Sequence, residues 1–589
     1  MRAGKLRDRI DVDAREGAAK FHCQMRVHSL AIDELISVVP TMPLLLRLLV
    51  CSSLLLSGVV TSKSFAGTTA PWVADNGDGT YRNPILYQDF SDPDVVRVGG
   101  DYYLTCSTFN LTPGLTLLHS RDLVNWSYLA QPLKSLVPAD HFAAVRPSEG
   151  VWAPSIRHHA GKFWIVYPDP DFGIYVISAK NPAGPWSAPH LLIAGKGLID
   201  PCPLWDDDGR AWLVHGWAKS RAGVSNRLTV REISEDCSRT LDSGKVVIDG
   251  AKLPGYRTLE GPKFYKRDGW YYIFAPAGGV REGWQSVFRA KDVHGPYEDR
   301  IVLDQGKTPV NGPHQGAWVE TPSGESWFFH FQEVDAIGRV THLQPMVWKD
   351  GWPVMGEDPE GDGKGQPVLV HKKPSVGGSN PICTPQVSDE FDGAELGMQW
   401  QWSANGKTEW ASLTAMPGKL RLAVQPWNGV GSLWHQASVL SQRMSGPSAT
   451  TTTKLQLDET SGDVRAGLIV MGDDYAWIGL ARDGGRVRVI LDTAKIVKAT
   501  PTAGEAEQAS ATIDGKMVWL RVTNVQNKCG FSYSVDGEIF TPLGEAFIAK
   551  QWGSWVGARV GVFAVAPRGA EASGHVDVDW FRVTAPEKP

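Results

Sequence analysis

A short pattern occurs five times between residues 99 and 328: a turn containing glycine, then one or two aromatic residues, then an apolar strand. Its copies are GGDYYL at 99–104, GKFWI at 161–165, DGRAWL at 208–213, DGWYYI at 268–273 and SGESWF at 323–328. When Tyr103, Trp164, Trp212, Tyr272 and Trp327 are taken as equivalent, the copies follow one another at 61, 48, 60 and 55 residues, and no segment between them has a helical apolar period. A repeat near fifty residues with glycine turns predicts a five-bladed β-propeller with four strands in each blade.

A second pattern supports this prediction. The runs SRDLVNW at 120–126, SAKNPAGPW at 178–186 and RAKDVHGPY at 289–297 each follow an aromatic hairpin at a similar distance and end in an aromatic residue. We interpret them as one outer-strand turn used three times, with the terminal aromatic side chain packed between blades.

The chain has 589 residues, 42% of them hydrophobic and 21% charged, and this length favours two domains. We expect the propeller at 75–360, a linker rich in glycine and proline at 361–387, and a second all-β domain at 388–589. Strand-like runs at 449–457, 465–471, 517–522 and 575–583 predict a two-sheet β-sandwich of the jelly-roll kind. The whole protein is therefore expected to be all-β.

Residues 1–66 read as an N-terminal extension that ends in a signal peptide. Residues 43–56 form an apolar core too short and too interrupted for a membrane span, and SFA at 64–66 fits a cleavage site before Gly67. We expect a secreted or periplasmic protein with no membrane attachment after cleavage; an uncleaved anchor is the alternative. A net charge of −5 provides no basic surface for nucleic acid.

Three carboxyl groups precede aromatic hairpins in three different repeats. Asp92 and Asp200 lie next to a proline, and Glu260 holds the same place before the fourth repeat, two residues from a proline. Because the inner strands of a propeller converge on its axis, these groups are expected to share one pocket. Glycoside hydrolysis needs a protonated acid and an opposing carboxylate, and a third carboxylate near the acid raises its pKa. Capping of strand ends or bonds to backbone amides are the alternatives.

From about residue 80 to 360 the chain resembles glycoside hydrolase family 43, five-bladed propeller enzymes that act on xylans and arabinans. The resemblance is carried by YRNPIL at 81–86, SDPDV at 91–95, VWAPSI at 151–156, IDP at 199–201, LEGPKFY at 259–265 and NGPHQG at 311–316. It implies an inverting mechanism with Asp92 as general base and Glu260 as general acid. Asp200 would tune and orient Glu260.

The resemblance also implies supporting roles, each with an alternative. His314 resembles an axial histidine that often binds calcium or another cation through water, and a hydrogen-bonding core role is its alternative. Arg339, in GRVTHLQP at 338–345, resembles an arginine that contacts substrate hydroxyls and the acids; its alternative is a surface salt bridge. Trp152 and Phe109 would form walls of the sugar pocket, unless they pack within the blades. No organic cofactor is expected.

Residues from about 388 onward resemble the concanavalin-like sandwich found after many β-xylosidase propellers of this family, where an edge loop closes one end of the pocket. The expected enzyme removes terminal β-D-xylosyl or α-L-arabinofuranosyl residues from plant hemicellulose. One alternative is a non-catalytic carbohydrate-binding propeller. Another is a retaining fructan-type glycosidase, whose two carboxyl groups would lie about 5 Å apart rather than about 6.5–9.5 Å.

Overall fold

A computed structural model describes residues 70–378, 380–427, 432–459, 461–495 and 504–587. These residues belong to one compact unit, Thr69–Pro589. The expected extension and signal peptide at 1–66 lie outside the described residues. Within the described ranges, no helix is long and apolar enough to cross a membrane.

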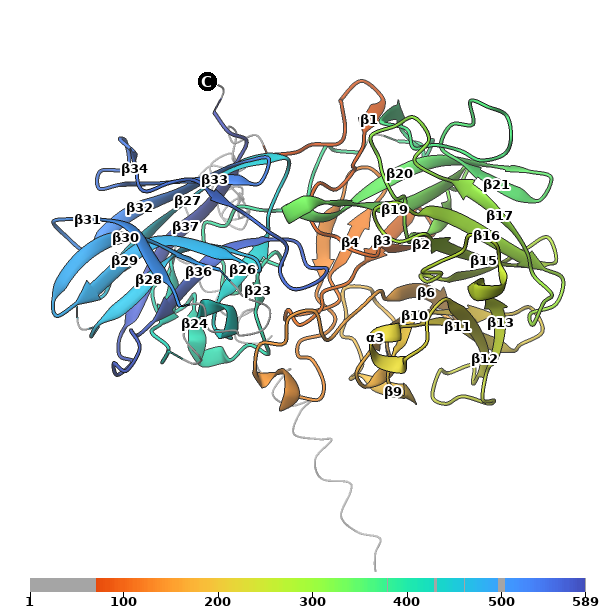
Figure 1. The fold of residues 1–589 in the computed structure, drawn as a ribbon, viewed down its shortest axis with the longest axis horizontal. Coiled ribbons are helices and arrows are strands. Elements are labelled where there is room, and N and C mark those ends of the chain that lie inside the picture. The colour runs from red at the N-terminus through yellow and green to blue at the C-terminus, as the bar shows by residue number, and fades with distance from the viewer. Residues whose placement is uncertain (1–69, 379, 428–431, 460, 496–503, 588–589) are drawn as a thin grey trace, which may run out of the picture. The chain divides into compact units, whose positions relative to one another are not determined.

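Five four-stranded antiparallel sheets follow one another along the chain and form the propeller, coloured from orange to green in Figure 1. Blade 1 contains β2 (Asp94–Val98), β3 (Asp101–Thr105), β4 (Leu117–Ser120) and β5 (Ser127–Ala130), and blade 2 contains β6 (Ser155–His159), β7 (Lys162–Asp169), β8 (Gly173–Ala179) and β9 (His190–Ala194). Blade 3 contains β10 (Leu198–Trp205), β11 (Ala211–Trp217), β12 (Arg227–Ile233) and β13 (Lys245–Asp249), and blade 4 contains β14 (Lys263–Arg267), β15 (Trp270–Ala277), β16 (Trp284–Ala290) and β17 (Glu298–Leu303). Blade 5 contains β18 (Trp318–Glu320), β19 (Ser326–Val334), β20 (Gly338–Lys349) and β21 (Trp352–Met355). The predicted five-bladed propeller is confirmed.

The repeated aromatic residues lie in the second strand of every blade, β3, β7, β11, β15 and β19. Each hairpin turn brings one of them opposite the inner strand, as in the pairs Val96–Tyr103 and Tyr265–Tyr272. The three outer turns join the third and fourth strands of blades 1, 2 and 4. Trp126, at the end of the first, is fully buried and packs edge-on against Phe329 of blade 5, which closes the ring of blades.

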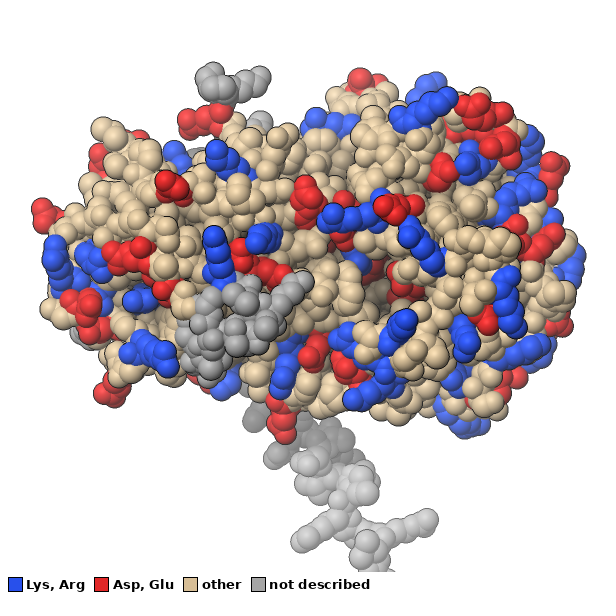
Figure 2. Space-filling model, in the orientation of Figure 1, with Lys and Arg blue, Asp and Glu red and all other residues tan. Residues whose placement is uncertain are grey.

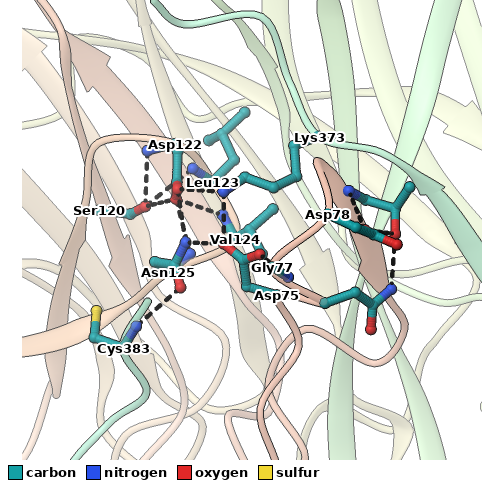
Figure 3. A network of polar contacts seen from close by, with 12 residues as sticks. Asp75, Gly77, Asp78, Ser120, Asp122, Leu123, Val124, Asn125, Lys373 and Cys383 are labelled. Carbon is teal, nitrogen blue, oxygen red and sulfur yellow. Dashed lines mark hydrogen bonds and ion pairs between the residues drawn. The ribbon is translucent and has the colours of Figure 1, made fainter. Parts of the chain in front are cut away.

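A polar network fixes this closure from outside (Figure 3). Asp122 accepts the backbone N–H groups of Val124 and Asn125, which shapes the outer turn of blade 1. Asn125 donates to Asp75 at 2.8 Å and accepts from the backbone of Cys383 at 3.0 Å. Lys373 forms an ion pair with Asp75 at 2.5 Å. Residues before the first blade and after the last are thereby joined, as they also are by the pair β1 (Thr80–Arg82) and β22 (Val370–Lys372).

The second domain is a sandwich of two antiparallel sheets, coloured from teal to blue in Figure 1. One sheet contains, in spatial order, β23 (Gln401–Trp402), β26 (Leu440–Arg443), β36 (Arg559–Val565), β28 (Val464–Met471), β29 (Tyr475–Asp483), β30 (Arg486–Ala494) and β31 (Ala506–Thr512). The other contains β24 (Ala411–Ser412), β25 (Leu420–Ala423), β37 (His575–Thr584), β27 (Ser448–Leu457), β32 (Met517–Val525), β33 (Lys528–Ser534) and β34 (Thr541–Pro542), with β35 (Phe547–Ile548) also paired to β33. The predicted sandwich is therefore confirmed.

Helices are few and short among the described residues, as the sequence pattern predicts. They are α3 (Lys219–Ala222) and the 3₁₀ turns η1 (His141–Ala143), η2 (Gly250–Lys252), η3 (Asp335–Ile337), η4 (Thr408–Trp410) and η5 (Leu433–His435).

The propeller and the sandwich share buried contacts. Phe109 and Leu111 of blade 1 and Ile337 and Val340 of blade 5 belong to the same apolar cluster as the sandwich core. Fully buried Asp89 accepts the backbone N–H of Arg339 at 2.9 Å and that of Gly557, in the sandwich, at 2.7 Å. Such buried charges persist only when hydrogen-bonded, so Asp89 fixes the loop before β36 against the first and last blades.

Candidate active site

Asp92, Asp200 and Glu260 line one pocket of about 330 Å³. They come from blades 1, 3 and 4, each at the start of an inner strand. The inner strands β2, β6, β10 and β14 contact one another in sequence, and β18 contacts β2, so residues at these strand ends meet near the axis. The same pocket is lined by Phe109, Trp152, Ala153, Ile199, Thr258, Gly279, Val280, Gln315, Arg339 and Trp555. Hence six of the seven site residues named from the sequence lie together, and the seventh, His314, contacts Glu260.

Strand register shows that the three acids are not strictly equivalent. In each blade, one inner-strand residue pairs with the second strand at the equivalent register position. These residues are, in blade order, Asp94, Ser155, Cys202, Lys263 and Ala317. Two residues before these positions stand, in blade order, Asp92, Ala153, Asp200, Gly261 and Gln315. The prediction that Glu260 holds the same place as Asp92 and Asp200 is therefore wrong, since Gly261 holds it and Glu260 precedes it by one residue.

Backbone geometry explains the displacement. Asp92, Asp200, Gly261 and Gln315 have φ values of 54°, 55°, 61° and 42°, a region that disfavours residues with a Cβ. At Gly261 a Cβ would also lie only 3.0 Å from the Gln315 side chain. A glycine therefore fills the blade 4 position, and the carboxyl group comes from its neighbour.

Hydrogen-bond donors surround Asp92, whose side chain is almost fully buried. Its Oδ2 accepts from the hydroxyl groups of Ser91 at 2.9 Å and Ser107 at 2.5 Å. Its Oδ1 accepts from Arg339 Nη1 at 2.8 Å. Three donors, one of them a guanidinium, suit an ionised carboxylate, which is the form that accepts a proton from water.

Asp200 lies at a bulge of β10 between Ile199 and Cys202. Its Oδ2 accepts the backbone N–H of Gly261 at 2.8 Å, and Gln315 Nε2 donates to its Oδ1 at 3.4 Å. Burial, and next the Glu260 carboxyl group, raise the pKa of Asp200 from 3.8 to about 7. We expected a raised pKa on Glu260; the structure shows one on Asp200, because that side chain is buried.

Glu260 is the most accessible of the three acids, with 29% of its side chain exposed. Its Oε1 lies 3.2 Å from Nε2 of buried His314, while His314 Nδ1 has no hydrogen-bond partner within the described residues. Calcium takes six to eight oxygen ligands, and no group of three or more His, Cys, Asp or Glu side chains able to hold a metal occurs in the described part of the chain. One imidazole does not fit a protein-coordinated calcium ion, so we assign no step to a metal.

Arg339 is 7% exposed and therefore does not form a surface salt bridge. It bonds Asp92 and Ser91, and its guanidinium lies 4.6 Å from the Phe331 ring centre. Phe109 lines the pocket and belongs to the apolar cluster shared with the sandwich core, rather than to a cluster within the blades.

Trp152 lines the pocket with part of its ring exposed. Its Nε1 donates to the Ser148 carbonyl at 2.9 Å, and Arg221 stacks 5.1 Å from its ring centre. The ring is therefore fixed from two sides, which suits a sugar-stacking wall.

Trp555 is a pocket-lining residue that the sequence did not predict. It comes from the sandwich, lines the pocket and packs edge-on against Trp152 with ring centres 4.7 Å apart. Its loop is fixed by Ser554 N donating to Ser148 and by Gly557 N donating to Asp89. Nothing in the local sequence marks it, because Trp555 reaches the pocket only through domain packing. Gln315 was also missed, although it stands in the quoted run 311–316.

Comparison with known proteins agrees with this arrangement. The model of glycosyl hydrolases family 43 matches residues 81–353, and that of the beta xylosidase C-terminal concanavalin A-like domain matches 388–584. A putative beta-xylosidase of Xylanibacter ruminicola is 42% identical over 503 residues, which cover 84% of this chain and 88% of that protein. The chain belongs to glycoside hydrolase family 43.

Other family 43 proteins are similar over both domains. A non-reducing end alpha-L-arabinofuranosidase of Bacteroides ovatus is 28% identical, covering 85% of this chain and 94% of its own. The crystal structure of a xylan beta-1,4-xylosidase from Bacillus halodurans superposes with a TM-score of 0.74 at 26% identity, over 85% of this chain and 99% of that one. This chain is thus a glycosidase of the xylosidase and arabinosidase family.

Proposed function

We propose that this family 43 enzyme removes terminal β-D-xylosyl or α-L-arabinofuranosyl residues from plant hemicellulose with inversion at the anomeric carbon. The observation that carries the proposal is that carboxyl groups from three blades, Asp92, Asp200 and Glu260, line one pocket. Xylosidase and arabinofuranosidase names among its relatives support both sugars.

The environments of the acids suggest their roles. Asp92, surrounded by donors and Arg339, is the general base that deprotonates water. Glu260, the most accessible acid, donates a proton to the leaving oxygen. Asp200, buried beside it and bonded to Gly261 N, keeps a proton within the pair at neutral pH.

A small pocket favours attack on chain ends. Its volume of about 330 Å³ is at the small end of ligand sites, and Phe109, Trp152 and Trp555 supply aromatic walls. Sugar C–H faces stack on such rings, so one terminal residue fits while the rest of the chain extends outward.

Export is part of the proposal and rests on the sequence alone. The apolar run 43–56 and the SFA site at 64–66 support secretion or delivery to the periplasm. N-terminal sequencing of the exported protein should begin at Gly67, and a protein retained with residues 43–56 would contradict export with cleavage.

Paired nitrophenyl substrates test the proposal most directly. Hydrolysis of the β-D-xyloside, the α-L-arabinofuranoside or both is expected, and no hydrolysis of either would contradict it. Proton NMR during early turnover should show α-xylose from the xyloside and β-arabinose from the arabinofuranoside. Release of the opposite anomers would establish the retaining mechanism instead.

A further inference from the structure

A second groove lies on the outward face of the eight-stranded sheet of the sandwich. Its volume is about 610 Å³, compared with about 330 Å³ for the catalytic pocket, and no residue lines both. Strands β27, β32 and β37 form its floor, with β27 in the middle. Nothing in the proposed hydrolytic mechanism uses this surface.

Strand register places the side chains on the groove floor in rows that run across the three strands. Lys454 of β27 pairs with Trp519 of β32 on one side and with Trp580 of β37 on the other. Because strands lie about 4.8 Å apart, the two indoles stand about 10 Å apart across the sheet. Gly537 packs against the Trp519 ring, where a Cβ would come within 2.9 Å, so this ring is held in place.

The next row lies two residues further along each strand. In it, Thr452 of β27 lies between Arg521 of β32 and Arg582 of β37. Arg582 forms a two-pronged ion pair with Glu390, each bond 2.8 Å long. In the tryptophan row, Lys454 pairs with Asp579 at 2.6 Å. Arg521 differs, since no carboxylate of the described residues lies within ion-pair distance of it.

The contacts of the Arg521 guanidinium leave it suited to bind a planar anion. Its guanidinium lies 3.5 Å from the Phe540 ring centre, and its Nε donates to Thr452 Oγ1 at 3.2 Å. Within the described residues, Nη1 and Nη2 have no hydrogen-bond partner. A stacked guanidinium with two free donors matches the two oxygens of a carboxylate. Exposed Glu587, at the rim, acts on Arg521 only at longer range.

We propose that this groove binds a polysaccharide chain that bears uronic acid groups, independently of the catalytic pocket. Lys454 lies over the Trp519 ring at 5.2 Å and Arg582 over the Trp580 ring at 4.2 Å, so the backbone sugars contact the parts of the two indoles that these cations leave exposed. Threonine hydroxyls on the same face meet sugar hydroxyls, and the uronate carboxylate is held by Arg521. The unpaired cation selects an acidic chain over a neutral one by charge complementarity. Binding here does not depend on the hydrolytic function proposed above.

Native affinity electrophoresis tests the groove, using full-length protein with Glu260→Gln so that the chain in the gel stays intact. Glucuronoxylan is the acidic probe, and a xylan freed of uronate is the neutral one. Parent protein should be retarded more strongly by glucuronoxylan, and Arg521→Gln should weaken that retardation about tenfold while leaving the neutral probe unchanged. The double variant Trp519→Ala/Trp580→Ala should weaken retardation by both, and Glu587→Gln should strengthen that by glucuronoxylan.

Matched controls separate the groove from general effects. Arg486→Gln removes an exposed arginine that bonds Thr512 in the other sheet, and Trp270→Ala removes a propeller indole that lies beneath two cations. Both should migrate like the parent. Equal retardation of parent and Arg521→Gln, or of parent by both xylans, would overturn the proposal. Each substitution introduced without Glu260→Gln should leave nitrophenyl glycoside turnover unchanged, which shows correct folding and tests the hydrolytic function separately.

Discussion

Asp200 accepts the backbone N–H of Gly261 at 2.8 Å, so the buried acid of blade 3 is tied to the residue directly after the acid of blade 4. Gly261 occupies the register position that Asp200 occupies in its own blade. The bond therefore holds the Glu260 backbone at a fixed place beside Asp200. The two carboxyl groups act as a unit because the backbone, and not only their charges, connects them.

Substituting the proposed acid should produce a loss that depends on the leaving group. Glu260→Ala should lower turnover of a xylo-oligosaccharide about 10²–10⁴-fold, and that of a nitrophenyl glycoside far less, because an activated phenol leaves without protonation. Steady-state kinetics on both substrates measures the difference. Glu282→Gln, an exposed neighbour paired with Arg257, is the control. Equal losses on both substrates would remove Glu260 from this role.

Asp200→Asn should move the basic limb of the pH–rate profile to lower pH. Burial first, and then the opposition of the neighbouring Glu260 carboxyl group, raise the pKa of Asp200 to about 7. An amide removes that opposition, so the proton leaves at lower pH. Profiles of kcat between pH 5 and 9 test this, and an unmoved limb would contradict the tuning role.

The same substitution should change the pH dependence of stability. The pKa of Asp200 rises from 3.8 to about 7 on folding, so the stability linked to its proton is complete below pH 3.8 and is lost as pH rises through about 7. An amide mimics the protonated form, and the variant should gain at most about 4 kcal/mol over wild type by pH 8 and somewhat less than half of that at pH 5, because unfolded Asp200 already ionises above pH 3.8. Denaturant unfolding at both values measures this. Exposed Asp236→Asn should show the same difference from wild type at pH 5 and pH 8.

Arg339→Met should reduce kcat/KM about 100-fold or more. Its removal leaves the buried Asp92 carboxylate without its cation, and a buried charge without a partner is costly. The melting temperature should fall as well. Arg210→Met, which breaks a pair with Asp208 in which both side chains are about half exposed, should leave kcat/KM nearly unchanged. Near wild-type activity of Arg339→Met would show that Asp92 does not depend on this cation.

Trp555→Ala should raise KM for short substrates about tenfold with a smaller effect on kcat, because the indole walls the pocket without touching the three acids directly. Kinetics on xylobiose and a nitrophenyl xyloside measure the split. Trp519→Ala, in the same domain but outside the pocket, is the matched control. An unchanged KM in Trp555→Ala would remove the sandwich from substrate binding.

The sequence predicted the features that depend on local sequence pattern. Glycine turns and paired aromatics recur because each blade needs one hairpin against its inner strand, so five copies were enough for five blades. Figure 2 shows Lys and Arg interspersed with Asp and Glu over one face of the molecule.

The features that the sequence did not predict depend on contacts between residues far apart in the chain. The place of Glu260 was mistaken by one residue because spacing along the chain does not reveal that the blade 3 hairpin is one residue longer: Leu204 pairs with Trp212, whereas in blade 4 Tyr265 pairs with Tyr272. Trp555 lies about 400 residues from Trp152 in sequence, and only the contact between domains brings the two rings together. Asp89 likewise appears ordinary in sequence, since its partners Arg339 and Gly557 are both backbone donors.

The Asp89–Gly557 bond also bears on recombination among relatives. Its two residues lie 468 positions apart, one before the first blade and one in the loop that carries Trp555. A hybrid gene that joins this propeller to a foreign sandwich at the linker would preserve every blade and every acid, yet would replace the Gly557 loop and, with it, one wall of the sugar pocket. Crossovers at the apparent domain boundary are therefore expected to give folded propellers with altered substrate specificity. The two domains must be exchanged together to preserve the sugar pocket.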